Sequence, residues 1–443
     1  MRRFLRASLA LLIIPFIAEK VSAEPSDYQR MLEVLSITSV RPGAEGFNRA
    51  SPNFANFDET KAGSYTLPDP LVAADGTAVK TPKDWWSKRR PEIAELFERE
   101  IYGRVPKEVP AVRWEMTGAE VPPARAVKAV TTHYIGHADN SAYPALKVDI
   151  VADVTLPAGV KGPVPVMIVL TFKGPWENMP VPAGQGEDWR DQLLKAGWGY
   201  VEYVPTSVQA DDPKKLREGI IGLTNRGGYR TPDQWGALRA WGWGVSRVID
   251  LLSTDKRVDA RKIGVAGHSR YGKAALVAMA FEPRLAFGYI SSSGAGGAKL
   301  LRRNFGEKLE NLSGEGEHHW MAGNFIAYGG PKTAADLPVD GHELIALAAP
   351  RPVLISAGIG DGTNPMEDAW TDQRGMFLAT VAASPVYQLL GAGALGTTEM
   401  PAVGTLVTKG ALAWRQHPFG HTMQPNWETF LTFVRSGLTS QHP

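Results

Sequence analysis

The stretch that decides the fold is Gly267-His268-Ser269-Arg270-Tyr271-Gly272-Lys273. It follows the apolar run 263–266 and precedes a segment rich in Ala, Leu and Met, 274–281. A serine between glycines, at a turn from strand to helix, is typical of hydrolases that present a nucleophilic hydroxyl, although the second glycine comes one position later than in Gly-x-Ser-x-Gly. The helix N-terminus behind such a serine can stabilise a developing negative charge. The sequence therefore predicts a nucleophile at Ser269.

Dense apolar segments alternate with helical patterns on both sides of this turn. Such alternation predicts an α/β fold of the α/β-hydrolase kind, a three-layer sandwich with a mostly parallel sheet. Ligands in such folds bind beyond the carboxyl ends of the strands. The expected strands are 164–172, 198–204, 262–266, 286–292, 352–357 and 411–416, and the expected helices are 189–196, 231–253, 270–281, 341–349, 366–381 and 425–436.

A serine hydroxyl needs a base, and the base needs an acid that orients it. In α/β-hydrolases the three follow in the order serine, acid, histidine, each after a strand. Asp361 follows the strand at 352–357, and His421 follows the strand at 411–416. The sequence therefore predicts a catalytic triad of Ser269, Asp361 and His421.

Each partner of the serine has a rival nearby. His417 comes directly after the last strand and before Pro418, where it could serve as the base or merely shape the loop. Glu367 and Asp368 compete with Asp361, but we expect them in the following helix as solvated residues or caps. His421, beyond Gly420, is the favoured base.

Two cations accompany the predicted nucleophile. Arg270 is its neighbour, and Lys273 lies one helical turn further on. A guanidinium at this position either supports the oxyanion or meets an acidic substrate. The alternative is a salt bridge to a nearby carboxylate.

The N-terminus has the pattern of a secretory signal peptide. Met1-Arg2-Arg3-Phe4-Leu5-Arg6 precedes an apolar stretch, 7–18, and Val21-Ser22-Ala23 offers a cleavage site. We expect residues 1–23 to be removed on export to the periplasm or the extracellular space, with no stable membrane association afterwards. A retained membrane anchor is the alternative.

Residues 24–84 are rich in Pro, Gly, Asn and Ser, which predicts an N-terminal extension packed on a catalytic α/β-hydrolase domain, 85–443. We expect a monomer.

Composition excludes several classes of function. The leader carries a net charge of +3, so the formal +2 of the chain leaves the mature part near −1. This charge does not indicate a nucleic-acid-binding surface. Cysteine is absent, which excludes thiolate chemistry and makes stability depend on core burial. Adjacent histidines such as His318-His319 point apart on a helix, so we expect no metal and no cofactor.

The heptad 267–273 resembles the hallmark Gly-Cys-Ser-Arg-x-Gly-Lys of the glucuronoyl esterases, carbohydrate esterase family 15, with His268 in place of the cysteine. The segments 97–103, 235–247 and 342–352 are also similar to that family, and the resemblance covers most of the chain from about residue 85. It implies an α/β-hydrolase fold and hydrolysis of esters on the carboxyl group of glucuronic or 4-O-methylglucuronic acid. In plant cell walls such esters join xylan side chains to lignin alcohols.

The resemblance also implies roles for single residues. Ser269 would attack the carbonyl carbon, and Arg270 would hold the oxyanion together with a backbone N–H. Lys273 and Glu310 would contact the sugar. A tryptophan tends to follow the acid and wall the sugar site; here Gly362 and Thr363 follow Asp361, and Trp370 comes nine residues after it.

One departure concerns the acid itself. Many members carry the acid in Glu-Ser-Gly-x-Gly-Gly, and this chain has Ser292 at the position of that glutamate. Some bacterial members place an Asp after a later strand instead, and Asp361 fits that alternative.

Two other functions remain open from the sequence. The altered residues after Asp361 are compatible with another secreted carbohydrate esterase, such as an acetyl xylan esterase, or with a general carboxylesterase. His268 and the missing acid at Ser292 are compatible with a carbohydrate-binding relative that has lost turnover. The series of Ser, Asp and His favours an active serine esterase for uronate esters.

Overall fold

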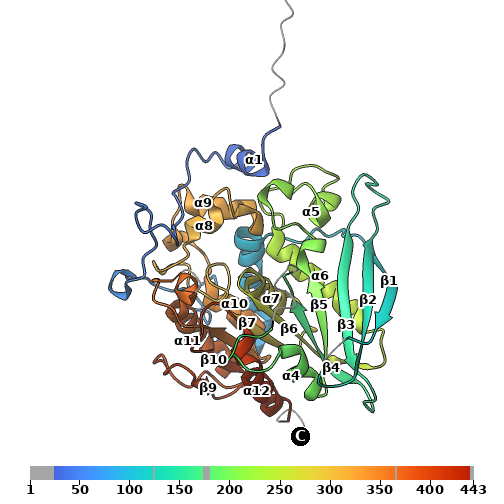
Figure 1. The fold of residues 1–443 in the computed structure, drawn as a ribbon. Coiled ribbons are helices and arrows are strands. Elements are labelled where there is room, and N and C mark those ends of the chain that lie inside the picture. Colours follow the sequence, from blue (N-terminus) through green and yellow to red (C-terminus); the bar gives the residue numbers. More distant parts are fainter. Residues whose placement is uncertain (1–23, 123–124, 173–179, 365–366, 440–443) are drawn as a thin grey trace, which may run out of the picture.

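A single ten-stranded sheet runs through the computed structural model, in the order β1-β2-β3-β5-β4-β6-β7-β8-β10-β9 (Figure 1). From β5 to β10 neighbouring strands are parallel, whereas β1, β2 and β3 are added antiparallel at one edge and β9 at the other. The prediction of a mostly parallel sheet is confirmed. The strands are β1 Val112–Glu120, β2 Ala129–Ala138, β3 Asp149–Pro157, β4 Val164–Leu170, β5 Gly199–Val204, β6 Val258–His268, β7 Phe287–Ser291, β8 Val353–Ala357, β9 Leu406–Thr408 and β10 Leu412–Gln416.

The structure describes residues 24–122, 125–172, 180–364 and 367–439. The predicted leader, 1–23, lies outside the described residues. No helix in these four ranges is long and apolar enough to cross a membrane.

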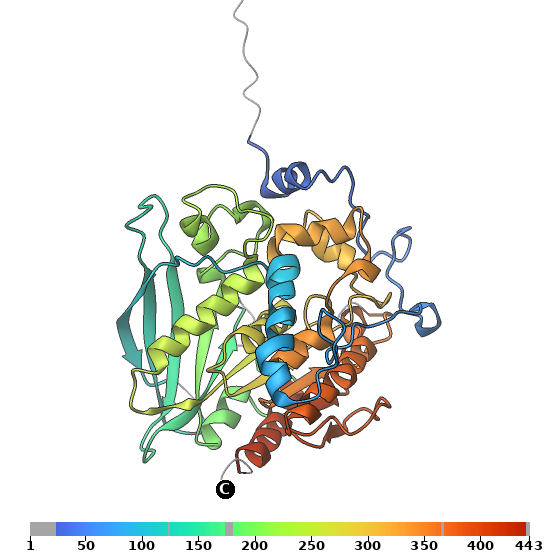
Figure 2. The same ribbon diagram turned by 180° about the vertical axis from the view of Figure 1, so that it is seen from behind.

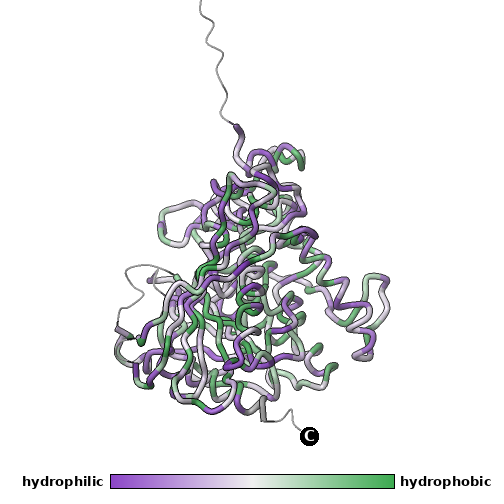
Figure 3. Tube along the Cα trace, turned by 90° about the vertical axis from the view of Figure 1, so that its right-hand side faces the viewer, coloured by the Kyte–Doolittle hydropathy of each residue, from purple (hydrophilic) through white to green (hydrophobic). Residues whose placement is uncertain are grey.

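Helices cover both faces of the sheet, and each face has its own hydrophobic cluster. One cluster joins α6, α7, α10 and α11 to strand residues such as Ile168, and the other joins α4 and α12 to residues such as Met167. Successive strand residues point to opposite faces, so these two neighbours enter different clusters. Figure 2 shows α6 on the rear face, and Figure 3 shows the hydrophobic stretches gathered in the interior. The helices are α1 Asp27–Val34, α2 Pro82–Asp84, α3 Arg90–Leu96, α4 Trp189–Lys195, α5 Gly219–Thr224, α6 Ala237–Leu252, α7 Arg270–Phe281, α8 Leu309–Ser313, α9 Ile326–Gly329, α10 Gly341–Ala348, α11 Gln373–Leu389 and α12 Trp427–Thr439.

Two predicted helices begin later than expected. The predicted start at Thr231 is wrong, because Trp235 and Gly236 donate their N–H groups to the carbonyls of Arg104 and Tyr102 and keep this segment outside α6. The predicted start at 366 is also wrong, since α11 begins after Asp372, whose side chain accepts the N–H of Gly375. Residues 367–372 therefore lie outside α11, and Asp368 among them bonds to Ile359, just beyond the end of β8.

The N-terminal segment runs along the outside of the molecule past α9 and α8 (Figure 1), and further along it the carbonyl of Pro68 lies 2.8 Å from Nε2 of His342 on α10. Asp27, at the start of α1, forms a buried ion pair with Arg230 at 3.1 Å. Arg41 donates to the carbonyls of Tyr328 and Gly330 and to the carboxylate of Glu310. These contacts fasten the beginning of the extension to the α8–α9 region and to the segment before α6.

Candidate active site

Ser269 lies at the turn between β6 and α7 in the left-handed region, at φ 58° and ψ −131°. A non-glycine residue there is strained, and such strain concentrates at functional sites. A Cβ on Gly267 would lie 2.0 Å from the carbonyl oxygen of Tyr271, and one on Gly272 would lie 2.6 Å from that of Ser291. Both glycines are therefore required by close backbone approach. Gly272 is needed where α7 passes the end of β7, which accounts for the late second glycine.

His421 lies in the loop after β10, and its partner is a buried carboxylate. Its Nδ1 lies 2.7 Å from Oδ1 of Asp368, whose side chain is completely buried, while that of His421 is 30% exposed. Burial would raise the pKa of Asp368, but the contacts with His421 and Ser292 outweigh it and hold that pKa below its usual value. An ionised carboxylate only accepts, so Nδ1 of His421 carries the proton and Nε2 is free to act as a base.

The prediction that Asp361 orients the histidine is wrong, because the structure gives that contact to Asp368. The Asp361 side chain is exposed and accepts the N–H of Thr363 at 2.8 Å. The hydrogen bonds with the side chain and the N–H of Thr363 lower the pKa of Asp361. Asp368 is not a solvated residue of a helix, as the sequence indicated, but begins the short 3₁₀ turn η9 (Asp368–Thr371). Its N–H donates to the carbonyl of Ile359, which folds the chain back onto the end of β8.

Ser292 supports this relocated acid. It lies just beyond β7 with a left-handed φ of 47°, at the position where many glucuronoyl esterases carry the acid. Its hydroxyl donates to Oδ2 of Asp368, and the N–H of Gly358 donates to the same oxygen. Ser292, which stands in place of the acid after β7, thus stabilises the carboxylate of Asp368, which follows the neighbouring strand β8.

His417, the rival base, is completely buried. Its Nε2 lies 2.8 Å from the carbonyl oxygen of Thr422, and its Nδ1 accepts the N–H of Phe419 at 3.3 Å. Both ring nitrogens are therefore used to shape the loop that carries His421.

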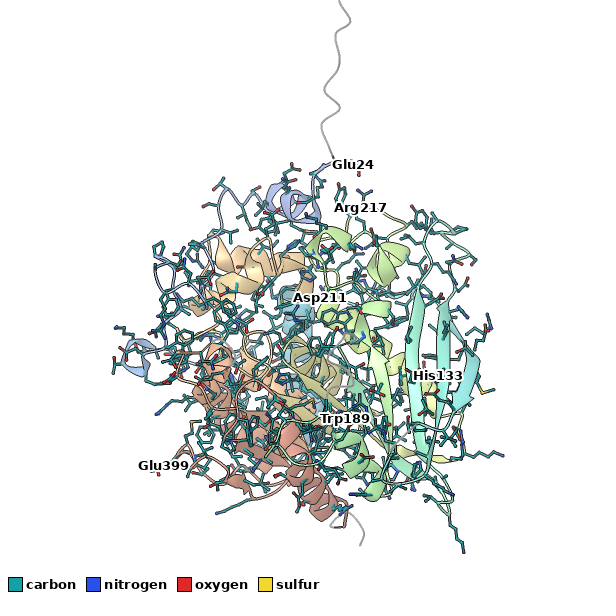
Figure 4. All side chains as sticks on the ribbon, in the orientation of Figure 1. Glu24, His133, Trp189, Asp211, Arg217 and Glu399 are labelled. Atoms are coloured by element: carbon teal, nitrogen blue, oxygen red, sulfur yellow. The ribbon has the colours of Figure 1, made fainter. Side chains whose placement is uncertain are left out.

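Arg270 extends over the face of Trp320 and is held there by Asp211. The guanidinium donates to Oδ2 of Asp211 at 2.6 Å, and its Cζ lies 5.1 Å from the ring centre of Trp320. Oδ1 of Asp211 lies 3.0 Å from Nε2 of His319 and accepts from Nε1 of Trp320 at 2.7 Å. Burial opposes ionisation of Asp211, but these partners hold its pKa well below the usual value. The salt-bridge alternative is thus realised, yet 41% of the Arg270 side chain stays exposed. Asp211 is labelled in Figure 4.

Lys273 is buried and paired. Its Nζ donates to Oε2 of Glu307 at 2.8 Å and to the carbonyl of Ala295 at 2.7 Å. The same carboxylate oxygen accepts the N–H of Ala295. Nζ also lies 5.7 Å from the ring centre of Trp320, so both cations border the same indole. The charge of Lys273 is largely compensated before any ligand arrives.

A carboxylate that sequence reasoning missed, Glu317, lies beside these cations. Burial and the nearby Glu307 raise its pKa to about 7, against the opposing effect of Lys273 and Arg270. Its Oε2 is buried and has no hydrogen-bond partner among the described residues. Glu310, the predicted sugar contact, pairs with Arg41 at 3.1 Å, and its role toward the sugar stays a prediction. No sequence pattern distinguishes Glu317 from the neighbouring acids, because its raised pKa results from burial in the folded protein.

The family model for "Glucuronyl esterase, fungi" matches residues 145–391. The chain is 32% identical over 440 residues to "Carbohydrate esterase MZ0003" from an unknown prokaryotic organism, covering 92% of this chain and 98% of that protein. It belongs to the glucuronoyl esterase family. A 4-O-methyl-glucuronoyl methylesterase of Wolfiporia cocos is 30% identical, with 73% of this chain and 72% of that protein covered. Among solved structures, a CE15 glucuronoyl esterase of Teredinibacter turnerae superposes with a TM-score of 0.86 at 45% identity, covering 93% and 98% of the two chains.

Trp370 is closer in sequence to Asp368, the carboxylate that pairs with His421, than to Asp361, the predicted acid. In glucuronoyl esterases a tryptophan is expected close after the acid, and Trp370 seemed distant when counted from Asp361. Counted from Asp368 it is two residues on, within the same turn η9. This short spacing is the sequence signal that could have identified Asp368.

No group of three or more His, Cys, Asp or Glu side chains that could hold a metal ion occurs among the residues the structure describes.

The N-terminal extension forms part of the wall around Trp370, which gives a first prediction. A Cβ on Gly46 would lie 2.8 Å from Cε3 of the Trp370 indole. We expect Gly46→Ala to displace this ring and to raise KM several-fold with little change in kcat, because overpacking shifts neighbouring side chains. Steady-state kinetics would check this. Gly118→Ala, where the new Cβ only meets ordinary van der Waals contact at 3.8 Å, is the matched control. Equal KM values for both variants would contradict the prediction.

Proposed function

We propose that this chain is a serine esterase that hydrolyses esters of glucuronic or 4-O-methylglucuronic acid at the sugar carboxyl group. The observation that carries the proposal is the pairing of His421 with a buried, ionised Asp368 at the strand ends next to Ser269. Membership of the glucuronoyl esterase family and the name of the Wolfiporia cocos relative support this choice of substrate. The natural ester would join glucuronoxylan to lignin.

The residues suggest a two-step reaction. Oγ of Ser269 attacks the ester carbonyl carbon while Nε2 of His421 takes its proton, and Asp368 stabilises the imidazolium. The C–O bond to the alcohol then breaks, and His421 gives its proton to the leaving oxygen. Water then attacks the carbonyl carbon of the acyl-serine while His421 takes a proton from it. The resulting tetrahedral intermediate breaks down, His421 returns the proton to Oγ of Ser269, and the uronic acid is released. Arg270 stabilises the oxyanion in both steps.

Release of acid from benzyl glucuronate, followed by titration at constant pH, tests the proposal. We expect turnover of uronate esters and much weaker turnover of acetylated xylan or aryl acetates. Preference for the acetyl esters would favour the acetyl xylan esterase alternative. A folded protein that releases acid from neither substrate would favour the inactive carbohydrate-binding alternative.

Arg270→Ala gives a second prediction. We expect kcat to fall by about 10²–10³-fold, because loss of one oxyanion donor typically costs this much. A rise in KM alone would show that the guanidinium binds the ground state instead. Arg302→Ala would serve as a control at another arginine, whose guanidinium donates to Asp340 and to the carbonyl of Leu337.

We also propose that the enzyme is exported after removal of residues 1–23 and acts as a monomer, without stable membrane association. The charged start and the apolar run of the leader support export. A mature N-terminus at Glu24 in the exported protein would support the cleavage site. The division into an extension, 24–84, and a catalytic domain, 85–443, stays a prediction.

A further inference from the structure

His268 stands where the family heptad has a cysteine, directly before the nucleophile, and its ring faces the loop of the catalytic base. The ring centres of His268 and His421 are 4.2 Å apart and the planes are tilted by 48°. The side chain of His268 is thus in contact with the base but is not one of the proposed triad residues.

Two contacts fix the His268 ring. Its Nδ1 lies 3.2 Å from Oγ of Ser291. The ring also packs against the ring of His421. A neutral imidazole has one donor and one acceptor nitrogen, so Nδ1 can form this hydrogen bond with the Ser291 hydroxyl in either tautomer.

Ser291 connects this histidine to the nucleophile. It is completely buried at the end of β7, and its carbonyl accepts the N–H of Ser269 at 3.0 Å. One residue therefore holds the turn of Ser269 through its backbone and the ring of His268 through its side chain. The next residue, Ser292, donates to Asp368.

We propose that His268 is a positioning residue that links the turn of Ser269, through Ser291, to the ring of His421 and keeps the base aligned between Asp368 and the nucleophile. The charged and titratable groups around it are His421, Asp368 and His417. Burial and the proximity of His421 lower the pKa of His268 well below its usual value, so the ring is neutral at neutral pH. A neutral ring adds no charge that would oppose the imidazolium of His421 during the reaction.

This proposal predicts an effect on kcat without a matching effect on KM. His268→Phe keeps a ring of similar size but removes the hydrogen bond with Ser291. We expect kcat to fall on the order of 10²-fold with KM nearly unchanged, because small misplacements of a catalytic group cost about this much. His268→Gln retains a donor and an acceptor and should recover activity to within about tenfold of the parent, since the amide can form the hydrogen bond with Ser291.

Ser291→Ala tests the connection itself. It removes the hydroxyl but leaves the carbonyl that binds Ser269. We expect it to lower kcat in the same direction, and we expect the double variant with His268→Phe to be no slower than the slower single variant. Effects that multiply would show that the two residues act independently and would overturn the proposal. Ser291→Ala and His268→Gln keep the test informative if His268→Phe does not fold.

The matched control is His342→Phe, which removes a buried imidazole away from the site, one whose Nε2 lies 2.8 Å from the carbonyl of Pro68. A purely structural role for His268 would lower the melting temperature in both variants and leave kcat unchanged in both. That result would overturn the proposal.

The inference rests on the proposed function, and a second readout separates the two. The rate at which a fluorophosphonate labels Ser269 depends on alignment of the base but not on the sugar. If the parent protein labels readily but hydrolyses no uronate ester, the proposed substrate is wrong, and the labelling rates still test His268. Equal labelling rates in parent and His268→Phe would overturn the positioning role.

Discussion

Asp368→Asn is expected to lower kcat by about 10⁴-fold, the loss typical of a triad whose acid becomes an amide. An asparagine cannot favour the Nδ1–H tautomer of His421, nor can it stabilise the imidazolium. Asp368 is also fully buried, and its Oδ2 accepts hydrogen bonds from Ser292 and Gly358. Solvent therefore cannot compensate for the lost charge. Steady-state hydrolysis of benzyl glucuronate measures the effect.

Asp361→Asn is the matched control, since both residues belong to the loop after β8. Asp361 is exposed, and an asparagine can still accept the N–H of Thr363. We expect kcat within about twofold of the parent, as for most surface substitutions away from a site. A large loss at Asp361 together with a small loss at Asp368 would restore the acid that the sequence indicated and contradict the structure.

Ser269→Ala is expected to lower kcat by at least about 10⁴-fold, because triad members act as a unit and removal of the nucleophile ends covalent catalysis. The variant should fold, since alanine retains the backbone and the N–H that donates to Ser291. The positive φ at this position strains alanine and serine alike.

Fluorophosphonate labelling followed by peptide mass spectrometry gives an independent readout of the nucleophile. We expect the label on the peptide that contains Ser269 and none on the Ser269→Ala variant. Ser384→Ala, on α11, is the control, because that hydroxyl donates to the carbonyl of Thr380 within its own helix. Labelling of Ser269→Ala at the same rate as the parent would show that another residue is the nucleophile.

Much of the site could be predicted from local sequence because local geometry produces it. The strand at 262–266 and the glycines at 267 and 272 produce a sharp turn from local sequence alone. The heptad 267–273 is therefore enough to identify Ser269. His421 follows the last parallel strand within a few residues, which leaves few rivals. The family resemblance adds the expected roles of Arg270 and Lys273.

The acid could not be predicted in the same way because a loop intervenes between it and its strand. Asp361 is nearer to β8 in sequence, but the N–H of Asp368 donates to Ile359 and its carboxylate accepts from Gly358. These bonds bring the more distant residue to the strand end. The expected helix start at 366 concealed this, because α11 begins only after Asp372.

The sequence by itself determined the class of fold and the strand-to-helix turn that carries Ser269, and it predicted this serine as the nucleophile, since strand and turn patterns are read from neighbouring residues. Only the tertiary structure decided which carboxylate reaches His421, that Glu317 is buried beside the cations, and that His268 contacts the base. Those facts depend on burial and on bonds between segments far apart in the chain, and a linear pattern records neither.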